Sequence, residues 1–139
     1  MRLNKLILGI ILFQFIEVVS FAQIKFEYSY STGRNDQARA ITQTKDSGYA
    51  VVGSTVTYEE NTDIYLLKTD ALGIFLWAKR FGDLGMEWGQ DIIETKDSGL
   101  AILGYGHNNG VYDMLFIKTD KNGNQLIKKF IGESDWDFG

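Results

Sequence analysis

The sequence predicts an all-β fold built from two copies of a four-stranded antiparallel unit. Three observations support this prediction. Residues 44–53 read TKDSGYAVVG and residues 95–104 read TKDSGLAILG, with seven of ten positions identical. Residues 63–70 (DIYLLKTD) return as residues 113–120 (DMLFIKTD). Short β-branched and aromatic runs alternate with turns rich in Gly, Asp and Ser, and a period of about 50 residues indicates an array of supersecondary units.

The N-terminal segment has the layout of a secretory signal peptide. Two basic residues precede an unbroken apolar run at residues 6–13 (LILGIILF), and residues 20–22 (SFA) offer a small–x–small cleavage site. A membrane anchor is the alternative, but Glu17 interrupts the stretch before it reaches the ~20 apolar residues that a spanning helix needs. We therefore expect removal of residues 1–22 and a secreted or cell-surface protein with no membrane span after cleavage.

The composition disfavours several classes of protein. The 139 residues carry 14 Lys and Arg against 18 Asp and Glu, a net charge of −4. Nucleic acids and anionic membranes need a basic face, so neither is an expected partner. The chain has no cysteine, which excludes a disulfide framework and a cysteine-based zinc site. No cofactor is expected.

The strand-like runs follow the same order in both repeats, and turn residues bound each run. The turns at 45–48 and 96–99 contain Asp and Ser, whose side chains bond their own backbone, and Gly, which supplies positive φ. The turns at 70–73 and 120–123 also end in Gly. Strands are therefore expected at 39–44, 49–57, 64–69 and 74–81 in the first repeat, and at 91–95, 100–105, 114–119 and 124–131 in the second.

The middle strands are nearly continuous in apolar residues, as at 50–52 (AVV) and 114–117 (MLFI), which indicates burial on both faces. Four-stranded antiparallel sheets that cover one another are the blades of a β-propeller, so the sequence predicts a partial β-propeller of about two blades plus an orphan N-terminal strand. A sandwich or a β-solenoid is the rival architecture. The predicted domains are a signal peptide (1–22), an orphan outer strand and joint (23–37), blade 1 (38–81), a joint (82–88), blade 2 (89–131) and the truncated start of the next joint (132–139).

The joints between repeats recur as well. Residues 81–89 (FGDLGMEWG) have a second copy at 131–139 (IGESDWDFG) and a weaker third copy at 30–38. Residues 26–30 (FEYSY) then fall where the fourth strand ends, and we interpret them as an orphan fourth strand. In closed propellers one terminus can complete the blade formed by the other, which removes exposed edges. We therefore expect missing C-terminal blades of a longer chain or, alternatively, closure by self-association.

Three segments together resemble a family of secreted bacterial propeller-like repeats. They are TKDSGYAVVG at 44–53, DIYLLKTDALGIFLWAKRFG at 63–82 and EWGQDI at 87–92. The resemblance covers nearly all of residues 24–139 and is fairly specific as a repeat signature.

The chain departs from the family pattern at a few positions. Ser47 and Ser98 replace the first Gly of a Gly pair, and Ile127 replaces the Trp found at Trp77. The resemblance implies a large surface or secreted protein, often with a C-terminal sorting domain for type IX secretion. It implies an adhesion, glycan-associated or scaffold role and no agreed enzymatic activity.

The joints are the best candidates for a functional site, because they place carboxylates beside aromatic rings on loops. A sugar can stack its C–H groups on an aromatic face and donate hydroxyl hydrogen bonds to carboxylates, and glycosidases need paired carboxylates. The candidate ligand-binding residues are Asp83, Glu87, Trp88 and Asp91 in one joint and Glu133, Asp135, Trp136 and Asp137 in the next.

A structural interpretation of the same residues is favoured over ligand binding and over catalysis. These residues recur with the repeat, whereas a catalytic pair normally occurs once in a protein. Trp88 and Phe138 would then wedge between neighbouring blades. Asp36, Glu87 and Asp137 would cap the backbone of the strand that follows.

The remaining polar residues are expected in turns or on the surface. Asp70 and Asp120 suit turn chemistry, because the faint calcium-loop pattern after Asp120 lacks the spacing and the distal Glu. No metal site is therefore expected. Lys68 and Lys118 are expected as edge or rim charges. His107 is expected in a solvated loop, with no Ser or Cys partner at a recognisable spacing.

The sequence thus favours a non-catalytic binding or scaffold module for a glycan or extracellular protein. The alternative is the propeller portion of a secreted polysaccharide-acting enzyme whose catalytic residues lie mostly outside this chain.

Overall fold

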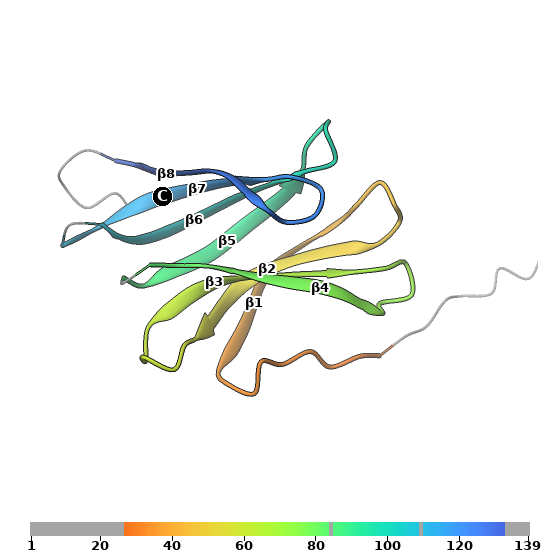
Figure 1. Ribbon diagram of the computed structural model, residues 1–139, viewed down its shortest axis with the longest axis horizontal. Coiled ribbons are helices and arrows are strands. Elements are labelled where there is room, and N and C mark those ends of the chain that lie inside the picture. The colour runs from red at the N-terminus through yellow and green to blue at the C-terminus, as the bar shows by residue number, and fades with distance from the viewer. Residues whose placement is uncertain (1–26, 84, 109, 133–139) are drawn as a thin grey trace, which may run out of the picture.

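A computed structural model describes residues 27–83, 85–108 and 110–132, and within these ranges the chain is all-β. Eight strands form two four-stranded antiparallel sheets, called here the first sheet (β1 to β4) and the second sheet (β5 to β8), each with its strands in sequence order (Figure 1). The strands are β1 (Asp36–Gln43), β2 (Tyr49–Val56), β3 (Thr62–Thr69), β4 (Phe75–Phe81), β5 (Glu87–Glu94), β6 (Leu100–Asn108), β7 (Val111–Thr119) and β8 (Gln125–Ile131). The all-β class is confirmed. Neither described sheet is closed, and their arrangement as propeller blades stays a prediction.

The sequence repeat is also a structural repeat. Both sheets carry an irregularity at the same place in their first strand, between Ala38 and Ala40 in β1 and between Gly89 and Asp91 in β5. We call two residues equivalent when they occupy the same place in the two sheets. Two equivalent residues pair across the strands with residues that are themselves equivalent, and their side chains lie on corresponding faces of the two sheets.

Strand ends differ from the predictions at the joints. β1 begins at Asp36 and β5 at Glu87, inside segments that the sequence assigned to joints. These residues are polar, but a β-ladder is made by backbone groups, and the backbone of Asp36 pairs with that of Thr55. His107 lies in β6 rather than in a solvated loop, because the β6–β7 hairpin continues to Asn108 and Val111.

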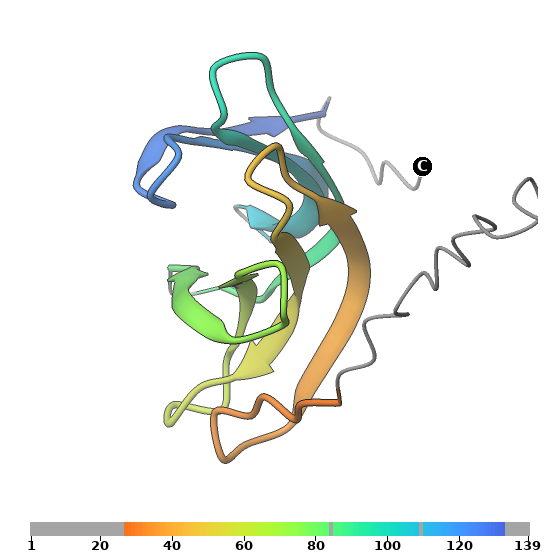
Figure 2. The same cartoon turned by 90° about the vertical axis from the view of Figure 1, so that its right-hand side faces the viewer.

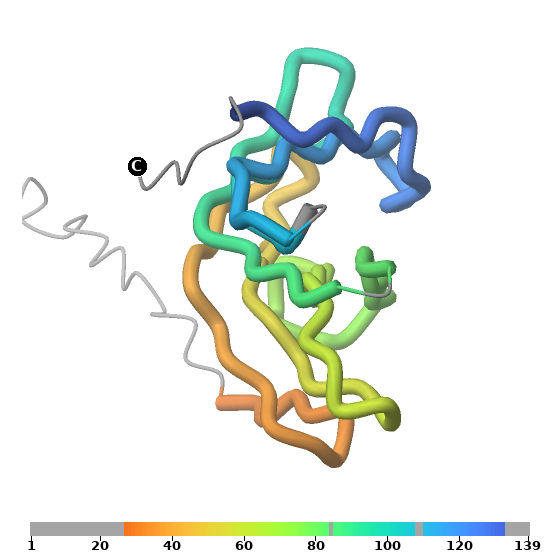
Figure 3. The backbone as a smooth tube through the Cα atoms, turned by 90° about the vertical axis from the view of Figure 1, so that its left-hand side faces the viewer, coloured from red at the N-terminus to blue at the C-terminus, as the bar shows by residue number. Residues whose placement is uncertain are grey.

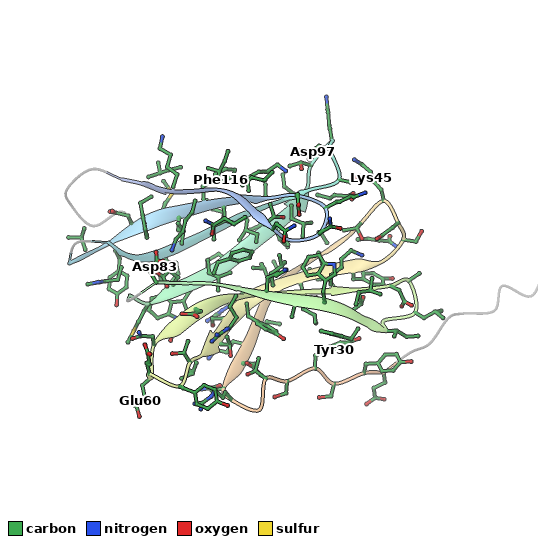
Figure 4. All side chains as sticks on the ribbon, in the orientation of Figure 1. Tyr30, Lys45, Glu60, Asp83, Asp97 and Phe116 are labelled. Atoms are coloured by element: carbon green, nitrogen blue, oxygen red, sulfur yellow. The ribbon has the colours of Figure 1, made fainter. Side chains whose placement is uncertain are left out.

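The predicted orphan strand is not a strand in the described residues. Residues 27–30 belong to neither sheet. They run along the side of the first sheet that faces away from the second sheet, where the Tyr30 hydroxyl donates a hydrogen bond to the carbonyl of Gly73 (Figure 4). A lone fourth strand needs a three-stranded sheet to complete, and both described sheets already have four strands. Phe26 lies outside the described residues.

The hydrophobic core lies between the two sheets. Side chains alternate between the faces of a strand, so each sheet has an inner face toward the other sheet and an outer face away from it. The core residues come from both inner faces, and all are almost fully buried. They are Ala50, Val52, Ile64, Leu66 and Phe81 from the first sheet, and Ile92, Leu100, Ile102, Leu115 and Ile117 from the second.

β5 makes the main contact between the sheets. It packs across β1, β2 and β3, and β1 and β5 run side by side along one side of the molecule (Figures 2 and 3). Gly89 permits this approach, because a Cβ at that position would lie 2.5 Å from Cγ2 of Val52 and 3.0 Å from the carbonyl oxygen of Gly53. A larger residue would push β5 away from the first sheet.

A polar cluster holds the β1–β2 turn to the end of β3. Lys68 Nζ lies 2.9 Å from Asp46 Oδ2 and donates a hydrogen bond to the carbonyl of Thr69 at 2.8 Å. The Thr44 hydroxyl and the backbone N–H of Gly48 donate to the same carboxylate. The Thr44 hydrogen bond, followed by Lys68, lowers the pKa of Asp46 to about 2. The prediction that Lys68 is a rim charge is therefore wrong, since only 6% of this residue is exposed.

The second sheet repeats this cluster. Lys118 Nζ lies 3.1 Å from Asp97 Oδ2, and the Thr95 hydroxyl donates to Asp97. That hydrogen bond, followed by Lys118, holds the pKa of Asp97 well below its ordinary value. Lys118 is thus not a rim charge either. The apolar stem of Lys118 lets the ammonium group reach the turn, and the side chain itself stays largely covered.

The other hairpin turns follow the predicted turn chemistry. Asp70 Oδ1 accepts the backbone N–H groups of Leu72 and Ile74, each at 2.8 Å. Asp120 Oδ1 accepts the equivalent pair from Asn122 and Asn124 at the same distances. The interpretation of Asp70 and Asp120 as turn residues is confirmed.

In the β1–β2 and β5–β6 turns, the residue with positive φ is the serine of the Ser-Gly pair and not the predicted glycine. Ser47 and Ser98 take the left-handed conformation, with φ of 66° and 62°. Gly48 is needed for space instead, because a Cβ there would lie 2.2 Å from the carbonyl oxygen of Thr69 and 2.5 Å from Lys68 Nζ. Glycine is the residue that adopts left-handed φ without strain, so the serine is the strained member of the pair.

This assignment predicts opposite effects for two neighbouring substitutions. Gly48→Ala should lower the free energy of unfolding by about 2 kcal/mol or more, because the methyl group forces Lys68 and the backbone apart. Ser47→Gly should raise it by about 0.5–1 kcal/mol through relief of left-handed strain. Urea denaturation measures both. Equal or reversed effects would contradict the assignment.

Candidate functional site

The structure separates the candidate residues of the first joint into two groups. Glu87 and Trp88 are neighbours in β5, so their side chains lie on opposite faces of the second sheet. Glu87 is on the inner face, with Asp83 beside it near Lys128, whereas Trp88 and Asp91 are on the outer face. The acidic–aromatic site predicted from adjacency is therefore not formed as one constellation. Glu133, Asp135, Trp136 and Asp137 lie outside the described residues.

The inner group is an ion-pair cluster in which Glu87 is buried, Lys128 is largely covered and Asp83 is exposed. Lys128 Nζ of β8 lies 2.5 Å from Asp83 Oδ2 and 3.9 Å from Glu87 Oε1. Glu87 is 1% exposed, and its Oε2 makes no hydrogen bond to any described group. Burial raises the pKa of Glu87, although Lys128 opposes the shift. Burial also raises the pKa of Asp63, a residue of the first sheet that lies close enough to Lys128 and Asp83 to be affected by their charges.

The joint carboxylates hold the loop before their strand. Asp36 accepts the backbone N–H and the hydroxyl of Thr32, each at 2.7 Å, and the hydroxyl of Ser31 at 3.1 Å. The carboxylate of Glu87, the equivalent of Asp36, lies close to the backbone N–H of Asp83. The prediction that Asp36 and Glu87 cap the following strand is therefore wrong, because both side chains turn back toward the joint.

The outer group belongs to a cluster of rings, which we call the aromatic patch (Trp88, Tyr105, His107 and Tyr112). The rings of Trp88 and Tyr105 are stacked with centroids 5.0 Å apart, and Tyr112 lies 5.8 Å from Trp88. The His107 ring meets the edge of Tyr112 at 5.4 Å. Three strands contribute to the patch, because Trp88 pairs with Tyr105 and His107 pairs with Tyr112 across the sheet. Trp88 thus does not wedge between the two described sheets.

Three members of the aromatic patch were missed by sequence reasoning. Tyr105, His107 and Tyr112 lie in different strands, and only the strand register brings them beside Trp88. A signal was nevertheless present, because the patch does not recur. The equivalent residues in the first sheet are small, polar or aliphatic: Gln37, Ser54, Val56 and Thr62.

Asp91 shares the outer face with the aromatic patch. It pairs with Leu103, two residues before Tyr105 in β6. The residue is exposed, and its Oδ1 accepts the backbone N–H of Ile92 at 2.8 Å. This face therefore combines stacked rings with an accessible carboxylate.

A hollow of about 510 Å³ lies at the end of the first sheet near the β2–β3 loop. Its lining includes Arg34, Tyr58, Lys79 and Arg80. The guanidinium of Arg34 lies 3.6 Å from the centre of the Tyr58 ring, so one face of that ring is already covered. The hollow therefore offers basic groups rather than an open stacking surface.

The described ranges contain no group of three or more His, Asp or Glu side chains placed to hold a metal ion. Within the same ranges no helix has the length and apolar character needed to cross a membrane. A scan against protein-family models and a search of curated proteins found no match to this chain. The resemblance to a secreted propeller-like repeat family therefore stays a prediction from the motifs.

The raised pKa of Glu87 predicts how stability depends on pH. A carboxyl whose folded-state pKa lies above its ordinary value of 4.5 favours folding below that value, and this contribution is lost as the pH rises through the folded-state pKa. Glu87→Gln keeps the neutral shape and removes the buried charge. We expect this variant to be more stable than the wild type by about 1 kcal/mol at neutral pH, with a difference that shrinks in acid.

Urea denaturation as a function of pH measures this difference. Glu59→Gln, at an exposed loop position, is the matched control and should follow the wild type at every pH. A Glu87→Gln variant that is less stable than the wild type at neutral pH would show that the Lys128 ion pair outweighs the cost of burying the charge.

Proposed function

We propose that this chain is a non-catalytic binding or scaffold module of an exported protein, with the aromatic patch as its contact surface for a glycan or protein partner. A glycan is the ligand we favour. The signal-peptide layout of residues 1–22 supports export. We also propose that the two stacked sheets are consecutive blades of a propeller-like array.

The observation that carries this proposal is the difference between the two sheets. A repeat builds its fold from the positions that recur, and the turn clusters around Lys68 and Lys118 recur in both sheets. Tyr105 and Tyr112 stand where the first sheet has Ser54 and Thr62. Large rings at positions where the same fold accepts small polar residues are therefore not required by the fold.

The chemistry of the aromatic patch suits a sugar. Tyr and Trp combine a broad apolar ring with a polar tip, so that one side chain can stack on C–H groups and bond a hydroxyl. Asp91, exposed on the same face, adds an acceptor for further hydroxyl groups. The net charge of −4 disfavours a polyanionic ligand such as a nucleic acid.

A catalytic role receives less support from the same region. Glycoside hydrolysis needs two carboxyl groups that flank the bond to be cleaved. Glu87 is buried on the inner face and Asp91 is exposed on the outer face, so these two carboxyl groups lie on opposite sides of the second sheet. Turnover of a polysaccharide that depends on Glu87 would overturn the non-catalytic proposal.

Exchange of residues between the repeats tests the proposal. The double variant Tyr105→Ser, Tyr112→Thr installs the side chains that the first sheet carries at the equivalent positions. We expect it to stay folded and to bind at least about tenfold more weakly, because both tyrosine rings of the patch are gone. Affinity electrophoresis against a panel of soluble polysaccharides measures the retardation of each variant.

Tyr58→Ser is the control, because Tyr58 is an exposed ring in the β2–β3 loop, outside the aromatic patch. It should be retarded like the wild type. Undiminished retardation of the folded double variant would contradict the proposal. Loss of binding together with loss of folding would instead assign the patch a structural role.

A further inference from the structure

The outer face of each sheet corresponds, residue by residue, to the inner face of the other sheet. On the outer face of the second sheet, Leu103 is 45% exposed, whereas its equivalent Val52 is fully buried in the core. On the outer face of the first sheet, Ile41 is 65% exposed, whereas its equivalent Ile92 is 4% exposed. Each chain therefore presents one half of the inter-sheet contact at one end and the other half at the opposite end.

The outer face of the second sheet has the apolar character of a core surface. The residues on this face are equivalent to residues on the inner face of the first sheet, which the second sheet covers. Leu103 pairs with Phe116 across β6 and β7, and Phe116 is labelled on this sheet in Figure 4. The apolar side chains on the uncovered face are Ile93, Ala101, Leu103, Met114 and Phe116.

The outer face of the first sheet contains a hollow at the matching place. Inside the chain, Val52 packs against Gly89 of β5. The equivalent of Gly89 is Ala38, which lines a hollow of about 250 Å³ together with Val51 and Leu67. Leu103 of another copy, as the equivalent of Val52, would point into this hollow.

A polar contact between the sheets supports the same match. Lys45 Nζ donates hydrogen bonds to the carbonyls of Thr95 and Lys96, each at 2.9 Å, and its backbone N–H donates to Glu94 Oε2 at 2.9 Å. Lys45 and Asp97 lie at the same end of the molecule in Figure 4. Lys96 is the equivalent of Lys45 and is exposed on the second sheet.

The acceptors that Lys96 would need are present on the first sheet. The carbonyls of Thr44 and Lys45 are equivalent to those of Thr95 and Lys96, and Gln43 stands where Glu94 stands in the second sheet. A second copy placed against the second sheet would therefore meet an apolar face and a lysine donor. Their relative arrangement is the one that already exists between the two sheets of one chain.

We propose that this chain associates head to tail with a second copy of itself, the outer face of the second sheet in one copy packing on the outer face of the first sheet in the next. The contact is heterologous, so copies add in one direction and end only when a ring closes. Residues 27–30 occupy part of the first sheet's outer face. Tyr30 aligns in sequence with Phe81, and the incoming copy would bring Ile131, the equivalent of Phe81, to the place of Tyr30 and displace it.

Part of the aromatic patch stays accessible in this assembly. In the first sheet the equivalent end of the inner face remains partly open although the second sheet is packed against it. Gln37 is exposed there and Val56 and Thr62 are half-buried, whereas Ser54, the equivalent of Tyr105, is buried. The contact would thus cover Tyr105 and leave the other rings of the patch at its rim, and the association does not depend on whether the patch binds a glycan.

Complementation between two variants tests the proposal. Ile41→Asp blocks one half of the contact and Leu103→Asp blocks the other, and both side chains are exposed in a single copy, so the variants should keep the melting temperature of the wild type. Sedimentation equilibrium of residues 23–139 at micromolar concentrations gives the mass. We expect the wild type to associate and each variant alone to be a monomer, with association weakened at least about tenfold by the buried charge.

An equimolar mixture of the two variants should regain a complex of one copy of each, because one retains the intact first-sheet face and the other the intact second-sheet face. Tyr58→Asp, which changes an exposed loop residue, should associate like the wild type. A monomeric wild type would overturn the proposal. A mixture that stays monomeric would do so as well. A single variant that still associates like the wild type would also overturn it, since that result indicates a symmetric contact between identical faces.

Discussion

The apolar contact between the inner faces is the interaction on which the rest of the structure depends. Neither four-stranded sheet covers its own apolar side chains, and each becomes stable by covering the other. β5 can approach the first sheet closely because Gly89 leaves room for Val52. Ile92 of β5 then enters a core shared by both sheets. Burial of this area supplies the main driving force for folding, in a chain that has no cysteine for disulfides.

Features that recur in both sheets stabilise the individual repeats. The Lys68 and Lys118 clusters hold equivalent turns, and the carboxylates of Asp36 and Glu87 hold equivalent joints. Features that do not recur are free to serve a partner. The aromatic patch is the clearest of these on the second sheet. Recurrence thus separates residues that build the fold from residues that can act on something outside it.

The sequence predicted the fold better than the site. Apolar runs and Asp- and Gly-containing turns located all eight strands, because each strand and hairpin turn is encoded locally. Lys68 was misplaced because burial of its ammonium group depends on Asp46, far away in the sequence. The candidate site was divided because adjacent residues Glu87 and Trp88 take opposite faces once β5 forms. Tyr105 and Tyr112 could be grouped with Trp88 only after the strand register was known.

The two sheets fold as one unit if their shared core stabilises both, and scanning calorimetry can detect this. We expect a single thermal transition whose calorimetric enthalpy equals the van't Hoff enthalpy, as expected for a two-state domain. Ile92→Ala, which opens a cavity in the core, should shift that one transition to lower temperature without splitting it. Two separate transitions, or a loss of only the second sheet's transition in the variant, would contradict the account.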